Sequence, residues 1–440
     1  LLAGETDTAQ SMAGNARYRA ALADVAAPQH IVSFVGLRQL FDVLPNFPKM
    51  VAGRVEERRK AEQRRQSGSN GASGPQGQTR PVTPADLPQD AQDFFNFFAA
   101  FLDEVNIIDY IVTSGRMDGY QELTYSAVKP DPSAANKPLF KIVAGSRPLG
   151  KFQRYLPVET RSFTAFGGAD LEGFYGWMLD FVRDKVPDGD QLYAKWAQVQ
   201  EKIGFNVQSQ LLGWLGAEVI IAEIPPAVPS PFGGGDAVLL WRVKERDRAR
   251  EMLDRGLKRI DALANEYSPP FSLQPATQIP ADGFLRINHF TTVAFQIQPC
   301  IGIWEDWLVM ASSENAVRLM IETANGKHPN ILENQRFRQE GLNVEGPVHY
   351  ASFQDMSQFG QQMAALFMGL GFGVASIPDS PETRPIKAIM QTMSGLGPVV
   401  SEINFINSVY SVTEYRDDRW YTTSKTTYKP PTKTAASHPE

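Results

Sequence analysis

The chain has one cysteine and five histidines among 440 residues, few of the residue types that build disulfides and metal centres. The single Cys300 cannot close an intramolecular disulfide, which excludes a disulfide-stapled scaffold. The histidines never recur at the short spacing of a helical zinc site, and no cysteine pair accompanies them. We therefore predict no metal site and no cofactor.

The sequence also lacks a long hydrophobic run. Its longest mostly apolar segment, Met363–Ala375, has thirteen residues, three of them glycine, whereas a membrane-spanning helix needs about 20. The sequence starts at Leu1 with neither an initiator methionine nor a basic segment ahead of an apolar stretch. We expect a soluble chain, from which any export signal or membrane tether has been removed or lies outside this sequence.

No excess of positive charge is present, since the formal net charge is -6. A chain of this sign has no global attraction to nucleic acid, so no nucleic-acid partner is predicted. Apolar residues make up 42% of the chain, a globular composition, and the length exceeds what one hydrophobic core usually serves. Two or three core-bearing units are expected.

Familiar catalytic motifs are missing as well. There is no Gly-x-Ser-x-Gly elbow, Gly233–Asp236 lacks the lysine and hydroxyl of a phosphate loop, and Gly369–Gly373 follows a predicted helix, so both glycine-rich segments are predicted to be turns. Asp170 and Asp355 stand where helix N-caps are expected. Cys300 is interpreted as a buried, inert thiol. We predict that the protein is not an enzyme.

What the sequence does contain is a repeat. Seven residues recur three hundred positions later, and both stretches alternate apolar and polar residues around a central aspartate. This pattern predicts two similar β-hairpins. The matching residues are Tyr110, Val112, Thr113, Arg116, Asp118, Lys129 and Pro130, and Tyr410, Val412, Thr413, Arg416, Asp418, Lys429 and Pro430.

Similar elements precede each hairpin. A strand followed by a helical stripe is predicted at His30–Phe34 and at Val348–Phe353, with a looser copy at Ser162–Phe166. A second helix follows at Ala91–Asp103 in the first copy and at about Ile386–Met393 in the last. The predicted fold is therefore α+β, with mainly antiparallel sheets, packed helices and duplicated strand-helix-loop-helix-hairpin units. Because His30 and His349 begin equivalent strands, we interpret both as structural.

A central unit is predicted between the two copies. It contains strands at Glu218–Ile224, Ala237–Val243, Thr291–Ile297, Cys300–Trp304 and Trp307–Ala311, an amphipathic helix at Ala249–Leu263 and a helix at Ser313–Ala324. The predicted divisions are a polar lead-in (1–29), a first repeat (30–150) with a mobile surface insertion at about 55–90, the central unit (151–335), a second repeat (336–431) and a tail (432–440).

Two segments carry more apolar surface than one helix face needs, the phenylalanine-rich helix at Ala91–Asp103 and the run Met363–Ala375. This surplus would serve a partner surface or an apolar groove. The alternative interpretation is that both segments pack on their own sheets or on each other. The candidate residues of an apolar interaction surface are Phe94, Phe98, Phe101, Phe367, Met368 and Phe372.

Four segments resemble a known family: Ser11–Arg19, Leu211–Val219, Leu239–Lys244 and Trp307–Ser313. They look like the bacterial family catalogued as domain of unknown function 3352, and the resemblance covers most of the chain. It implies an exported protein of the bacterial cell envelope, in the periplasm or at the cell surface, often tethered near its amino end. Family members commonly have sequence ahead of the first of these segments, and the family supplies no functional residues to transfer.

We therefore expect a non-catalytic extracytoplasmic protein with a structural or interaction role, whose partners are other envelope proteins. The first alternative is a carrier for a lipid or another apolar ligand, held in a pocket of several hundred Å³. A hydrolase is the less favoured third class. An apolar cavity with few polar groups would favour the carrier, a flat apolar patch would favour a protein partner, and a cleft with a convergent acid, base and nucleophile would favour the enzyme.

Overall fold

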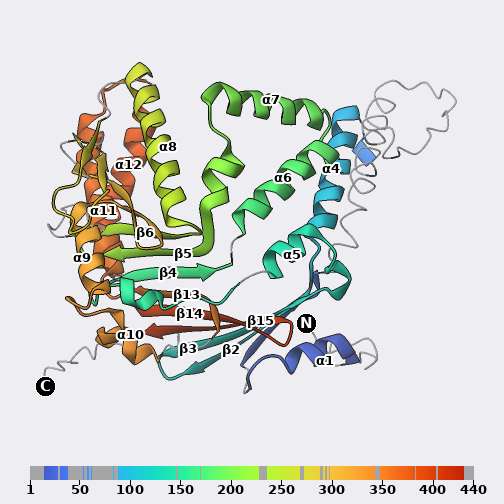
Figure 1. Ribbon diagram of the computed structural model, residues 1–440. Helices are drawn as coiled ribbons and strands as arrows, with labels where there is room; N and C mark the ends of the chain where they lie inside the picture. Colours follow the sequence, from blue (N-terminus) through green and yellow to red (C-terminus); the bar gives the residue numbers. More distant parts are fainter. Residues whose placement is uncertain are drawn as a thin grey trace, which may run out of the picture.

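The structure is a computed structural model that describes residues 14–27, 30–37, 53, 57–58, 61, 83, 88–144, 147–168, 170–226, 235–267, 272–287, 291–292, 295–296, 298–341, 347–381, 383–402 and 405–430. The predicted stripe after Leu37, nearly all of the insertion at 55–90, Gly233, Gly234 and the tail lie outside these residues. Within them the fold is α+β, as predicted, and is built on a 13-stranded antiparallel sheet (Figure 1).

The strands have the following bounds. They are β1 (Ile31–Val35), β2 (Ile108–Asp118), β3 (Gln121–Pro130), β4 (Ser162–Gly167), β5 (Leu215–Ile224), β6 (Asp236–Val243), β7 (Leu273–Pro275), β8 (Leu285–Ile287), β9 (Thr291–Thr292), β10 (Phe295–Gln296), β11 (Cys300–Trp304), β12 (Trp307–Ala311), β13 (Val348–Asp355), β14 (Ile406–Arg416) and β15 (Arg419–Tyr428). The strand predicted at Thr291–Ile297 is wrong as one element, because β9 and β10 are two-residue strands that pair only with each other.

The helices carry the labels of Figure 1. They are α1 (Ala16–Leu22), α4 (Gln89–Val105), α5 (Pro138–Ala144), α6 (Leu171–Lys185), α7 (Gly189–Ile203), α8 (Arg246–Tyr267), α9 (Glu314–Ala324), α10 (Gln335–Glu340), α11 (Phe359–Ser376), α12 (Arg384–Gly395) and α13 (Gly397–Glu402). In the described part of the chain, no helix has the length and apolar character to cross a membrane.

One sheet runs through all three predicted units. Its strand order is β1-β2-β3-β15-β14-β13-β4-β5-β6-β12-β11-β8-β7, and β6 to β2 can be followed from top to bottom in Figure 1. The two predicted hairpins are β2–β3 and β14–β15. The order in the sheet differs from the order in the sequence, since β3 of the first repeat pairs directly with β15 of the second and the strands of the central unit follow β13. This arrangement pairs β3, β15 and β14 on both sides, while β1 covers part of the outer edge of β2.

The pairing of β3 with β15 is symmetric in register. Tyr125 lies opposite Thr423, and each is the fifth residue of its strand, so residues that hold the same place in the two hairpins exchange sides across this point. In an isologous interface the same surface of two subunits meets itself, and the β3–β15 pairing has this symmetry within one chain. The predicted equivalence of Phe34 and Phe353 agrees with this alignment, because they lie opposite Val112 and Tyr410, the fifth residues of β2 and β14. The strands of the two hairpins match at an offset two residues shorter than the three hundred seen in the sequence. A common origin of the two units remains a prediction.

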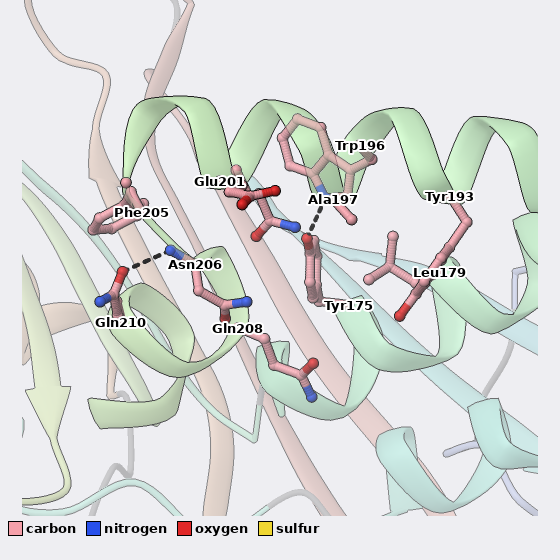
Figure 2. A pocket seen from close by; sticks show the side chains of 12 residues that line it. Tyr175, Leu179, Tyr193, Trp196, Ala197, Glu201, Phe205, Asn206, Gln208 and Gln210 are labelled. Atoms are coloured by element: carbon pink, nitrogen blue, oxygen red, sulfur yellow. Dashed lines mark hydrogen bonds between the residues drawn. The ribbon is translucent and has the colours of Figure 1, made fainter.

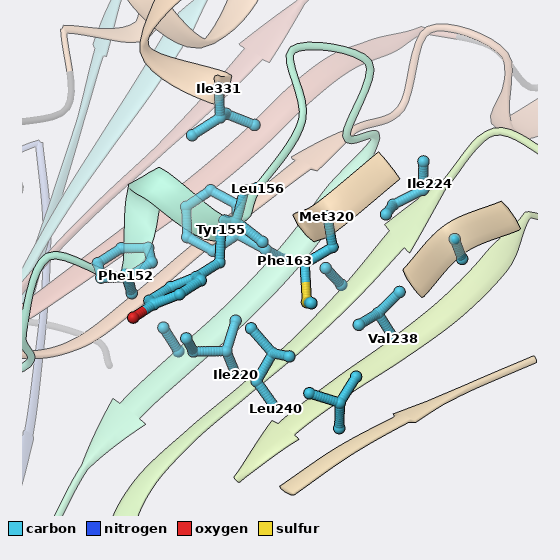
Figure 3. Packing of buried hydrophobic residues seen from close by; sticks show 14 of the residues in the cluster. Phe152, Tyr155, Leu156, Phe163, Ile220, Ile224, Val238, Leu240, Met320 and Ile331 are labelled. Atoms are coloured by element: carbon cyan, nitrogen blue, oxygen red, sulfur yellow. The ribbon is translucent and has the colours of Figure 1, made fainter. Parts of the chain in front are cut away.

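The sheet has one face that carries most of the core. Residues opposite each other on neighbouring strands share a face, and the buried side chains of β2, β3, β14, β13, β4, β5, β6 and β12 follow one such face. The turn Phe152–Tyr155 and helices α1, α9 and α10 cover it. Figure 3 shows Phe152, Tyr155 and Met320 packed over Phe163, Ile220 and Leu240.

The lead-in, predicted to be polar, takes part in this core. Its helix α1 is capped by Asn15, whose side chain accepts hydrogen bonds from two backbone amides, and Ala21 is fully buried. Asp24 accepts a hydrogen bond of 2.6 Å from the Tyr110 hydroxyl and pairs with Arg419 at 2.8 Å. One aspartate thus connects the lead-in to β2 of the first hairpin and to β15 of the second.

This contact makes a pH-dependent prediction. Burial, followed by the hydrogen bond to Asp24, raises the pKa of Tyr110 far above its usual range. The folded protein therefore keeps this proton where the unfolded chain releases it, and the contribution is complete below pH ~10 and lost above it. We expect the free energy of unfolding to fall above pH ~10 by about 1.4 kcal/mol per pH unit for this tyrosine. Urea unfolding between pH 9 and 11 measures how steeply the free energy of unfolding falls with pH. If Tyr110→Phe shows the same steepness as the unchanged protein, Tyr110 is not the group responsible.

The other face of the sheet changes character along its width. One row begins with hydroxyl side chains on five strands and continues with apolar side chains on the next four. Thr413 and Thr422 in the adjacent row, and Ser411 and Ser424 in this one, are hydrogen-bonded at 2.9 and 2.8 Å. In strand order the row is Thr124, Ser424, Ser411, Ser352, Thr164, Ile221, Leu239, Met310 and Ile301. The boundary between the two halves lies between β4 and β5.

Two local predictions are wrong and one is confirmed. Gly369–Gly373 is part of α11 and not a turn, because the absence of a side chain at Gly371 allows close approach to α12: a Cβ there would lie 2.6 Å from Oγ of Ser394. Asp355 accepts from Ser357 N at the end of β13, but Gln358 is the N-cap position of α11. Asp170 caps α6 as predicted, by accepting a hydrogen bond from Gly173 N.

Candidate binding site

The residues predicted to form one apolar interaction surface lie in two places. Helix α4 carries Phe94, Phe98 and Phe101, and α11, on the opposite side of the molecule in Figure 1, carries Phe367 and Met368. The side chain of Phe372 lies outside the described residues. The two helices therefore do not pack on each other.

Each of these helices packs on other helices. The ring centroids of Phe101 and Phe181 of α6 lie 6.0 Å apart. Phe94 stacks on Phe98 within α4. Met368 of α11 lies close to Gly397 of α13. Phe94 is 58% exposed and Met368 is 50% exposed. The structure thus offers two separate apolar patches where the sequence predicted one surface.

A more concentrated apolar site lies beneath helix α8. It is a groove of about 400 Å³ between α8, the turn before β5 and strands β11 and β12. We call it the α8 groove. Its lining residues are Phe205, Gln210, Leu211, Trp214, Met252, Leu253, Gly256, Leu257, Arg259, Ile260, Ile301, Leu308 and Met310.

The folded chain leaves part of this apolar lining uncovered. Leu211, Ile260 and Met310 are 38%, 50% and 42% exposed. Met310 and Ile301 also end the row that crosses the second face of the sheet, so the groove is the apolar end of that row. Covering this surface is favourable by about 25 cal/mol per Å² of apolar area, and nothing within the described residues does so.

Helix α8 keeps the groove open by a gap in its apolar stripe. Met252, Leu253 and Leu257 face the sheet from α8, but Gly256 lies among them and also lines the groove. A Cβ placed on Gly256 would meet no atom within 4 Å. Glycine is costly inside a helix, by about 1 kcal/mol relative to alanine, so this position sacrifices helix stability and leaves space in the groove.

The opposite wall of the groove is a rigidly bonded turn. Residues Val207–Leu211 form a π-helical turn, a conformation that is rare and often found at functional sites. Asn206 N donates to Oε1 of Gln210 at 2.6 Å, and Val207 N donates to Oε1 of Gln200 at 2.8 Å. The indole of Trp214 donates to the Gln210 carbonyl at 2.7 Å. These bonds fix Leu211 and Trp214 against the groove.

The same turn borders a second cavity, of about 470 Å³, between α6 and α7 (Figure 2). We call it the aromatic pocket. Phe205 and Gln210 line both cavities, so the two meet at this turn. Trp196 Nε1 donates to the Tyr175 hydroxyl at 2.6 Å. The lining is Tyr175, Leu179, Tyr193, Trp196, Ala197, Gln200, Glu201, Gly204, Phe205, Asn206, Gln208 and Gln210.

The core holds the two side chains that could be taken for a nucleophile and a base, Cys300 and His349. Cys300 is buried, and burial raises the pKa of its thiol to about 12, so it is protonated at neutral pH. His349 is buried in β13, and burial lowers its pKa, which leaves the ring neutral. Among the described residues, no group of three or more histidine, cysteine, aspartate or glutamate side chains is placed to hold a metal ion.

One buried polar cluster was not foreseen from the sequence. Glu340 at the end of α10 pairs with Lys425 of β15 at 3.2 Å and accepts hydrogen bonds from the hydroxyls of Ser408 and Thr427. Burial and the charge of Glu340 raise the pKa of the adjacent Tyr410. Ser408 is fully buried, so a substrate cannot reach it. The cluster attaches α10 to the second hairpin.

Comparison of the chain with models of protein families, with curated proteins and with solved structures found no match. Function must therefore be inferred from the cavities themselves. Of the six predicted surface residues, the five whose side chains are described line neither cavity. The sequence showed the apolar stripe of α8, Ile260 included, but not that Ile260 would stay exposed and line one groove with Met310.

Proposed function

We propose that this chain is a non-catalytic binding protein, a carrier or receptor for an apolar or amphipathic small molecule, and that the α8 groove is its site. The observation that carries the proposal is the groove itself, whose lining is apolar apart from Gln210 and Arg259. Its volume of about 400 Å³ is within the range of small-molecule sites. The carrier, the first alternative from the sequence, is thus the better supported of the two binding functions.

Two features distinguish the groove from a gap in the core. Its apolar residues come from three separated segments that converge on one space, and Gly256 keeps that space free. The bonds within the turn before β5 hold the opposite wall in place without a ligand. A site that is formed in advance avoids much of the ordering cost of binding.

The place of action is proposed from the family resemblance. A bacterial envelope protein, working in the periplasm or at the cell surface and tethered near its amino end, would meet apolar molecules in transit to or from a membrane. Fractionation of the source cells into cytoplasm, periplasm and membranes, followed by detection with an antibody, tests this location. Recovery of the protein only with the cytoplasm would contradict it.

A second function, contact with an envelope protein, is favoured by the patch on α12 and α13. Ile386 and Ile389 of α12 and Val399 of α13 are all more than half exposed. Three large apolar side chains on neighbouring helices form a surface suited to a protein partner. This patch is separate from the α8 groove, so both functions are compatible in one chain.

The proposal is tested by filling the groove. In Gly256→Leu the new side chain occupies the groove, yet its Cβ meets no atom, and helix propensity favours leucine over glycine by about 1 kcal/mol. We expect the affinity for the neutral fluorescent probe N-phenyl-1-naphthylamine to fall at least tenfold while the free energy of unfolding does not decrease. The control is Gly395→Leu in α12, where a Cβ likewise meets no atom and which is not among the residues that line the groove.

Equal probe affinity in Gly256→Leu and in the unchanged protein would remove the groove as the site. Native mass spectrometry of protein isolated from its source adds an independent measurement, because it reports retained small molecules and bound subunits together. A mass excess that is lost in Gly256→Leu and kept in Gly395→Leu supports the proposal.

A further inference from the structure

The geometry points to the class of ligand: we infer that the site takes a single-chain amphiphile with an uncharged sugar head group, its alkyl chain in the α8 groove and its sugar in the aromatic pocket. This inference rests on the proposed function. It adds the aromatic pocket, which the groove alone does not explain, and it assigns a head-group chemistry.

The two cavities are arranged for one molecule. Phe205 and Gln210 line both of them, so the apolar groove and the polar pocket meet at a single turn of the chain. Two cavities of about 400 and 470 Å³ would each hold only part of an amphiphile. A ligand with an apolar end and a polar end satisfies both linings at once.

The lining of the aromatic pocket suits a sugar. A pyranose has apolar C–H faces that pack on aromatic rings, and Tyr175, Tyr193 and Trp196 supply such rings (Figure 2). Its hydroxyls both donate and accept, and amide side chains do the same. The oxygens of Gln200 and Gln210 already accept backbone N–H groups, which makes their NH₂ groups the ends available to a ligand.

Charge argues against the other common head groups. Glu201 is the one acidic residue of the lining, and no lysine or arginine is among the lining residues. A phosphate or carboxylate would be placed beside this carboxylate without a compensating cation, which is unfavourable in a partly desolvated site. The Arg183 guanidinium, 5.7 Å from the Tyr193 ring centroid, already pairs with Asp180 and Asp184.

A quaternary ammonium head group fits less well than a sugar. Such a cation is bound by the faces of several aromatic rings, but the positive Arg183 guanidinium lies 5.7 Å from the Tyr193 ring centroid and repels a second cation, which an uncharged sugar is not. The hydroxyl of Tyr175 also accepts the Trp196 N–H, which fixes these two rings edge to edge through their polar atoms. The four amide side chains of the lining would have no partner on an alkylammonium group.

The experiment compares head groups on one chain. Dodecyl glucoside, dodecylphosphocholine, dodecyltrimethylammonium and dodecanoate are titrated calorimetrically, each below its critical micelle concentration. We expect the glucoside to bind at least tenfold more tightly than the other three. Octyl and decyl glucosides should bind more weakly, by about fourfold for each CH₂ removed, as long as the chain lies in the groove.

Two variants separate the contributions. Tyr193→Ala removes a ring of the pocket that is 39% exposed, so the fold should tolerate it; the preference for glucoside should fall to within about threefold of dodecylphosphocholine, with binding of the other amphiphiles unchanged. Gly256→Leu should weaken all four amphiphiles at least tenfold. Thermal unfolding of both variants confirms that they are folded.

The outcomes distinguish the inference from the proposed function. If Gly256→Leu weakens the binding of every amphiphile but the four bind equally to the unchanged protein, the groove remains the proposed site and the sugar assignment is wrong. If the ammonium, phosphocholine or carboxylate compound binds most tightly, the sugar assignment also falls. If Gly256→Leu leaves glucoside binding unchanged, the proposed function itself is wrong.

Discussion

Replacement of Lys425 by methionine should lower the free energy of unfolding by about 3–5 kcal/mol, the cost of leaving one member of a buried ion pair without its partner. The side chains of Lys425 and Glu340 are only 9% and 5% exposed. In the variant the Glu340 carboxylate keeps the hydroxyls of Ser408 and Thr427, but it loses the only cation that pairs with it in the described structure. Urea unfolding monitored by tryptophan fluorescence measures the loss.

The matched control is Lys258→Met on α8, which breaks a pair with Asp254 at the same kind of distance, 2.6 Å, but on an exposed surface. Exposed ion pairs between residues four apart on a helix contribute about 0.3–0.5 kcal/mol to stability. A second variant, Lys425→Met with Glu340→Leu, removes both charges and should recover much of the loss. Equal effects of Lys425→Met and Lys258→Met would show that the buried pair has no special importance.

Truncation of Phe353 to alanine should cost about 3–5 kcal/mol, the usual range for a large aromatic side chain in a packed core. Phe353 lies on β13, near the middle of the sheet, and is 1% exposed. Its ring lies 5.4 Å from Phe337 in an edge-on contact and 6.3 Å from Phe163. The cavity would open where strands of the second repeat, the central unit and α10 meet, so collapse around it is restricted.

Phe94→Ala is the control, because it removes the same atoms from an exposed position on α4. Its effect should stay within about 0.5 kcal/mol. Chemical denaturation of the two variants under identical conditions gives the comparison directly. Similar midpoints would mean that β13 is not part of the core that determines stability.

The elements with strong local patterns could be predicted from the sequence. The two hairpins follow from alternation over ten residues on each side of a short turn, and both are present. At the second turn, Asp417 and Asp418 both have positive φ, as a two-residue hairpin loop demands. Helix α8 follows from an apolar stripe at helical spacing.

The parts that were missed depend on contacts between distant segments. No local pattern states that β3 pairs with β15, since both hairpins offer an edge of similar composition. The glycines at 369–373 resemble a turn by themselves, and only the approach of α12 to Gly371 explains why a helix tolerates them. The lead-in has few apolar residues, yet Asp24 and Ala21 place it on the core.

The site was harder to predict for a related reason. The stripe of Met252, Leu253 and Leu257 is typical of a helix that packs on a sheet, and it does so. What makes a groove is the combination of Gly256 with Leu211 and Met310, which come from segments far apart in the sequence. The phenylalanines of α4 gave a stronger local signal, because local hydrophobicity does not distinguish a cavity from a helix contact.

The symmetric register between β3 and β15 has a consequence for a half-length chain. Since Tyr125 and Thr423 occupy the same position in the two hairpins and face each other, a polypeptide with only one such unit already presents an edge that matches a second molecule of itself. Two copies would extend a common sheet without any new surface having to arise. Joining them in one gene would then fix the partner at high local concentration and free each half to diverge.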